Sequence, residues 1–140
     1  MGKINWGGVV LCGLLAGVVL NVIDYVLYGV LLAKDYDAAL QALGKQSMSM
    51  GLILWFVFLD FIYGIGLIWL YAAIRPRFNP GPQTAVIAGL ALWFFIAFLH
   101  TLGEAPLQLF PHRLYVIGTV VALVEYPVAA AVGAYAYKEA

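Results

Sequence analysis

The chain has 140 residues, of which 65% are hydrophobic and 10% are charged, and its seven basic residues balance its seven acidic ones. A typical soluble domain is about 45–50% apolar and about 25% charged, so this chain has too few charged side chains to cover a soluble domain of its size. The composition excludes a soluble enzyme, a disordered tail and a disulfide scaffold, and the balanced charge excludes a nucleic-acid-binding surface. A polytopic membrane domain with the lipid bilayer as its partner remains.

Four apolar stretches are each long enough to cross the hydrocarbon core of a bilayer, which takes about 20 residues of helix. The stretches are residues 8–33, 49–74, 84–106 and 114–137. Helices satisfy their own backbone hydrogen bonds in lipid, and the stretches lack the alternation of a transmembrane barrel. The predicted fold is therefore an all-α transmembrane four-helix bundle that forms a single domain over residues 1–140.

The connecting segments fit this arrangement. Residues 34–45 are polar and weakly amphipathic, which predicts a short helix on the membrane surface that ends at Gly44. Residues 75–82 contain three prolines and are predicted to form a rigid turn, because proline does not continue a helix. Residues 111–113 are predicted to form a tight link between the last two spans.

The orientation follows from the lysines and arginines of the short loops. The N-terminus, the second loop and the C-terminus carry four of them and the other two loops carry three, which favours both termini in the cytoplasm. No small-residue cleavage site follows the first apolar stretch at signal-peptide distance, so we expect this stretch to be retained as a span. The predicted location is a bacterial inner membrane. The lone Cys12 is interpreted as a packing residue.

Each predicted span carries one carboxylate within its apolar run: Asp24, Asp60, Glu104 and Glu125. A charge at the bilayer centre costs roughly 2.5–3.5 kcal/mol on insertion scales. We therefore expect these acids to be protonated, paired, hydrated or metal-bound inside the bundle.

Helical spacing places the acids on faces made of small residues, which suit packing between helices. Asp24 shares its face with Asn21 and with the G-x-x-x-G pattern of Gly13 and Gly17. His100 lies four residues before Glu104, so the two share a face of the third span. The spacing predicts one interior polar cluster, whose members are Asn21, Asp24, Asp60, His100, Glu104 and Glu125.

Three interpretations of this cluster stay open. The first is a structural clasp that fixes helix register. The second is a pathway for protons, cations or a small solute, and the third is a divalent-metal or redox site. The metal interpretation uses His100 and Glu104 with Glu125, a nitrogen-and-oxygen set that suits iron, manganese or zinc. No G-x-S-x-G motif is present, and we assign no catalytic residue and no cofactor.

The C-terminal half resembles a bacterial family of small four-span membrane proteins of unknown function. The resemblance lies in residues 88–90 with Trp93, in residues 109–111 and in the end of the last span, residues 133–139. It implies four helices and an inner-membrane location, and it implies no activity. The many aromatic residues of the second and third spans predict a lipid-facing or docking surface, so we expect a homo-oligomer or an accessory subunit of a larger membrane complex.

Overall fold

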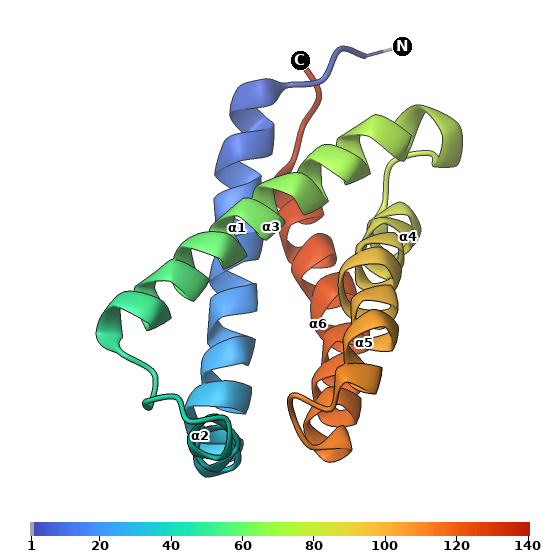
Figure 1. Ribbon diagram of the computed structural model, residues 1–140. Helices are drawn as coiled ribbons and strands as arrows, with labels where there is room; N and C mark the ends of the chain where they lie inside the picture. Colours follow the sequence, from blue (N-terminus) through green and yellow to red (C-terminus); the bar gives the residue numbers. More distant parts are fainter. Residues whose placement is uncertain (1) are drawn as a thin grey trace.

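Four helices that are long and apolar enough to cross a membrane dominate the computed structural model, which describes residues 2–140 (Figure 1). The four helices cover Trp6–Leu31, Met50–Phe78, Pro82–Leu107 and His112–Ala136. No strand is found among the described residues, so the predicted all-α fold is confirmed. The chain is a multi-pass membrane protein, and both ends lie at the same end of the bundle, as an even number of spans requires (Figure 1).

Two of the four long helices change their helical form along their length. The first comprises α1 (Trp6–Asp24) and the π-helical segment η1 (Tyr25–Leu31). The third comprises α4 (Pro82–Leu92), the π-helical η2 (Trp93–Phe98), α5 (Leu99–Glu104) and the 3-10 turn η3 (Ala105–Leu107). The other two are α3 (Met50–Phe78) and α6 (His112–Ala136), and a short α2 (Ala33–Ala42) lies between the first two spans.

Polar residues just outside the spans start the helices. The side chain of Asn5 accepts a hydrogen bond of 2.9 Å from the amide of Gly8 and caps α1. Ser49 accepts one of 3.2 Å from the amide of Leu52 and caps α3. Each cap satisfies an amide that has no partner within its helix, which contributes about 1 kcal/mol.

The predicted surface helix is present as α2. It ends before Gly44, whose φ of +70° lies in the left-handed region that glycine adopts freely. The amide of Gly44 then donates to the carbonyl of Gln41, and the amide of Lys45 to that of Leu40. Ala39 of α2 is buried together with Leu27 and Leu114, so α2 packs onto the end of the bundle.

The predicted turn over residues 75–82 is wrong in its first half, because α3 continues through Pro76 to Phe78. One proline removes only one backbone hydrogen bond, and the loss falls in the last turn of a long helix. The chain reverses later, at Asn79 and Gly81, which have φ values of +67° and +140°. The predicted link over residues 111–113 also shifts, since α6 already begins at His112.

The half of the bundle that holds the termini is closely packed. Its core consists of small and branched residues that are almost completely buried: Val9, Ala16, Leu20, Leu67, Ile68, Ala85, Ala88, Ala129 and Ala130. Helix α3 runs obliquely across α1 (Figure 1). At the end of this half, the guanidinium of Arg75 lies between the rings of Tyr71 and Tyr137, at 5.5 and 5.4 Å from their centroids.

The G-x-x-x-G pattern brings α1 and α3 into contact, as predicted. Gly13 and Gly17 face Gly64 of α3, and a Cβ on Gly64 would clash with backbone atoms of both. Backbone atoms cannot rotate away as a side chain does. The close approach of the two helices therefore depends on these three glycines.

We expect Gly64→Ala to lower the free energy of unfolding by about 1–3 kcal/mol, because the added methyl group forces the two backbones apart. Unfolding in mixed micelles, followed by circular dichroism, measures this loss. Gly66→Ala is the matched control, since no atom lies within 4 Å of a Cβ at that position. Alanine favours the helix more than glycine does, so an equal loss in both variants would show that the contact between α1 and α3 does not set the cost.

Candidate functional site

Three carboxyl groups from three helices meet inside the bundle. Asp24 is the last residue of α1, Asp60 lies in the first half of α3, and Glu125 lies in the middle of α6. The carboxyl group of Asp24 is in hydrogen-bonding contact with those of Asp60 and Glu125. Asp60 is 9% exposed and Glu125 5% exposed. We call these three residues the carboxyl triad.

No cationic side chain among the described residues forms an ion pair with the carboxyl triad. The ion pairs among residues 2–140 join other groups, namely Arg75 with Glu139, His100 with Glu104 and Arg113 with Asp35. A hydrogen bond between two carboxyl groups requires that one of them carries the proton. The two contacts of Asp24 are therefore suited to sharing protons between the carboxyl groups.

A pocket of about 250 Å³ adjoins the triad. Asp24 and Glu125 line it, whereas Asp60 touches Asp24 from outside the pocket. Polar groups make up much of the remaining wall: Tyr28, Tyr36, His100, Thr101, Glu104, Tyr115, Thr119 and Tyr126. No lysine or arginine of the described residues lines it. We call this cavity the acidic pocket.

The two π-helical segments both border the acidic pocket. Tyr28 of η1 lines it, as do Ile96 and Ala97 of η2. The wider turn is visible in the hydrogen bond of 2.8 Å from the amide of Leu32 to the carbonyl of Leu27, five residues earlier. Such turns are rare and are frequently found at functional sites. The sequence analysis predicted neither π-helical segment, because mostly hydrophobic residues precede and follow each one and the hydrophobic periodicity does not change there.

Tyrosines close the acidic pocket toward α2. The rings of Tyr28 and Tyr36 meet edge to face, with 5.3 Å between their centroids. Burial raises the pKa of the Tyr36 phenol, so this side chain is a neutral hydroxyl group at physiological pH. It supplies a dipole and an aromatic ring to the pocket, but no charge.

His100 and Glu104 lie at the edge of the acidic pocket. Their side chains are 3.1 Å apart, as the i, i+4 spacing predicts, but the side chain of His100 is 69% exposed. No group of three or more His, Cys, Asp or Glu side chains among residues 2–140 is arranged to hold a metal ion. The structure thus brings His100 and Glu104 together, and places Glu125 in the same pocket without completing a three-ligand site.

Asn21 lies outside the acidic pocket, unlike the predicted cluster. Its amide group donates to the carbonyl of Gly17 at 3.0 Å and to that of Val57 at 3.3 Å, and so ties α1 to α3. A second clasp, which sequence reasoning missed, joins the third span to α6. The indole of Trp93 donates to the carbonyl of Thr119 at 2.8 Å, and the hydroxyl groups of Thr101 and Thr119 are 3.0 Å apart.

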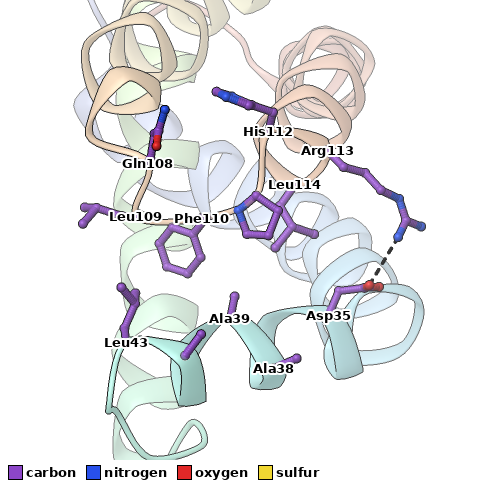
Figure 2. Close-up of a pocket in the computed structure, with 12 residues that line it drawn as sticks. Asp35, Ala38, Ala39, Leu43, Gln108, Leu109, Phe110, His112, Arg113 and Leu114 are labelled. Atoms are coloured by element: carbon purple, nitrogen blue, oxygen red, sulfur yellow. Dashed lines mark hydrogen bonds and ion pairs between the residues drawn. The ribbon is translucent and has the colours of Figure 1, made fainter.

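A larger groove of about 820 Å³ lies between α2 and the segment that leads into α6 (Figure 2). Arg113 reaches across it to Asp35, with 3.2 Å between Nη1 and Oδ1. Figure 2 shows the ring of Phe110 directed at α2. Phe110 and Leu114 line both this outer groove and the acidic pocket. The two cavities are therefore neighbours, separated by these side chains.

No family model, curated protein or solved structure matches the chain. The resemblance to a bacterial four-span family stays a prediction. The acidic pocket and the carboxyl triad are therefore the main structural indications of function.

Proposed function

We propose that the chain forms a pathway for protons or small cations, with the acidic pocket as its access route and the carboxyl triad as its binding site. The observation that carries this proposal is the contact of Asp24 with Asp60 and Glu125, next to a pocket that no lysine or arginine of residues 2–140 lines. Ionisable groups placed inside a membrane bundle characteristically mark ion pathways and proton relays.

The contacts within the triad give the order of the relay. Asp24 touches both other carboxyl groups, so a proton that arrives at Glu125 reaches Asp60 through Asp24. Asp60 faces the closely packed half of the bundle, where the residues around Gly64 and Leu67 leave little free space. The site loads from one side of the membrane, and release of the proton on the other side requires a transient opening of the closely packed half beyond Asp60.

The loading side is the end of the bundle opposite the termini. Tyr36 of α2 and Phe110 line the acidic pocket, and α2 lies at that end (Figure 1). With both termini in the cytoplasm of a bacterial inner membrane, as the loop charges favour, the pocket faces the outer side. We propose this orientation of the pocket together with the function.

A second candidate function is that of an accessory subunit, and one surface favours it. Every residue from Gly51 to Phe56 is exposed, which leaves this end of α3 without packing on any side within the chain. The rings of Trp55 and Phe58 meet there at a tilt of 32°, with 5.7 Å between their centroids. A second copy or a larger membrane partner would cover this surface, and the carboxyl triad would then act as an interhelical clasp.

Proton flux into liposomes that contain the purified protein tests the proposed function. We expect the wild-type chain to dissipate an imposed pH gradient, and the triple variant Asp24→Asn/Asp60→Asn/Glu125→Gln to leave the liposomes as tight as empty ones. Asp37→Asn is the matched control, because Asp37 lines neither cavity. Equal tightness of wild-type and triple-variant liposomes, for protons and for monovalent cations, would contradict the proposal and favour the clasp.

A further inference from the structure

We infer that the acidic pocket binds a small organic ammonium ion, which is held by carboxylates and by tyrosine rings. This inference rests on the proposed function, because it names the cation that the pocket takes besides the proton. Three properties of the wall carry it: its charge, its aromatic content and its size.

The charge of the wall favours a cation. Asp24, Glu104 and Glu125 line the pocket, and of these only Glu104 has a basic partner, which is His100. Glu125 is 5% exposed and has no cationic side chain within 4 Å among the described residues. A buried carboxylate is stable when a counter-charge is supplied, and here the bound ligand is the group that can supply it.

The aromatic content favours an organic cation over a metal ion. Four tyrosines line the same pocket: Tyr28, Tyr36, Tyr115 and Tyr126. Aromatic faces attract ammonium groups and recognise alkylated ones in aromatic cages. A metal ion would instead need several ligands around one point, and no group of three or more His, Cys, Asp or Glu side chains among residues 2–140 is arranged in that way.

The size limits the ligand to a few carbon atoms. The pocket of about 250 Å³ is smaller than the roughly 300–1,000 Å³ of sites for drug-sized molecules. Thr101 and Thr119 add hydroxyl groups to the wall, so a ligand that carries one hydroxyl group besides its ammonium group fits the available chemistry.

Choline and its uncharged carbon isostere, 3,3-dimethylbutan-1-ol, test the inference on the wild-type chain. The two molecules have the same shape, and only choline carries a charge. We expect saturable binding of choline to the purified full chain in lipid nanodiscs, measured by calorimetry, and binding of the isostere that is weaker by about tenfold or more. Equal affinities, or no saturable binding of choline, would overturn the inference.

Tyrosine variants of α6 test the aromatic contribution. We expect Tyr126→Leu to weaken choline binding about tenfold and Tyr126→Phe to retain it, since phenylalanine keeps the ring face. Tyr135→Leu is the matched control, because Tyr135 lies on the same helix and is 94% exposed. Loss of binding in Tyr126→Phe as well, or none in Tyr126→Leu, would contradict an aromatic cage; circular dichroism and gel filtration establish that each variant is folded.

The failure of this inference is distinguishable from the failure of the proposed function. Proton flux that depends on the carboxyl triad, without choline binding, would overturn the ammonium site and leave the proton pathway intact. Choline binding that is lost in Glu125→Gln, without proton flux in the wild type, would support the ammonium site and remove the proton from the proposal. Absence of both would overturn both.

Discussion

Replacement of Asp24 by asparagine is expected to lower proton flux by on the order of a hundredfold, the low end of what one positioned proton-transfer group contributes. Asp24 is the member of the triad whose carboxyl group touches both others. An amide keeps the shape and can still hydrogen-bond, but it neither takes up nor releases a proton at physiological pH. The helices should therefore stay together while the relay is broken, and liposome flux with circular dichroism of the same samples measures the two effects separately.

Double variants decide whether the three carboxyl groups act as one unit. In the Asp24→Asn background, the additional change Glu125→Gln should reduce flux little further, because the relay is already interrupted. A structural clasp gives a different result: each lost interhelical hydrogen bond lowers the unfolding free energy by about 0.6 kcal/mol, and flux does not respond. Independent, multiplicative effects of the two variants on flux would contradict a shared relay.

The positions of the acids could be predicted from spacing alone, because small residues on a transmembrane helix mark the face that packs. Gly13 and Gly17 precede Asp24 by whole turns, and they contact α3 at Gly64, close to Asp60. Glu125 likewise lies one turn from Ala122 and from Ala129, and both alanines are buried. Hydrophobicity and length likewise predicted the four spans, since both are summed over some 20 residues.

Other features depend on contacts between helices, which the spacing of residues along a single helix does not predict. Helical periodicity places Asn21 on the same face as Asp24. Its amide group, however, donates a hydrogen bond to the carbonyl of Val57 on α3 and does not line the pocket. His100 shares a face with Glu104, but its side chain is 69% exposed, at the start of α5 and directly after the π-helical η2. Pro76 fits within α3 because it lies in the last turn of the helix, where only one backbone hydrogen bond is lost.

The side chains that separate the outer groove from the acidic pocket form a barrier near the proposed loading side of the bundle. Phe110 lies 5.6 Å from Tyr36 and 6.1 Å from Tyr115, measured between ring centroids. Its backbone follows Gln108, whose φ of +53° is left-handed, in a link with no regular helix. A bulky ring on a short irregular link is easier to displace than one on a packed helix, so movement of Phe110 is the simplest way to join the two cavities.

Phe110→Ala is accordingly expected to increase access to the acidic pocket about tenfold. Burial of a phenylalanine side chain contributes about 1.5–3 kcal/mol, and partial loss of such contacts corresponds to a tenfold or larger shift in an opening equilibrium. The measurement is the rate at which a membrane-impermeant trimethylammonium thiosulfonate modifies Ala122→Cys, with Cys12→Ala in the background. Ala122 lines the pocket and is buried, so its reaction reports on access from the outer groove.

Two comparisons make the result specific to the barrier. The native Cys12 of the otherwise unchanged chain is buried in the closely packed half, so its modification should stay slow with or without Phe110. Leu109→Ala removes a neighbouring side chain that lines the outer groove but not the acidic pocket, and should leave the rate at Ala122→Cys unchanged. Faster modification of Cys12 in Phe110→Ala would indicate general loosening of the bundle, whereas a selective increase at position 122 identifies the ring of Phe110 as the barrier between the groove and the carboxylates.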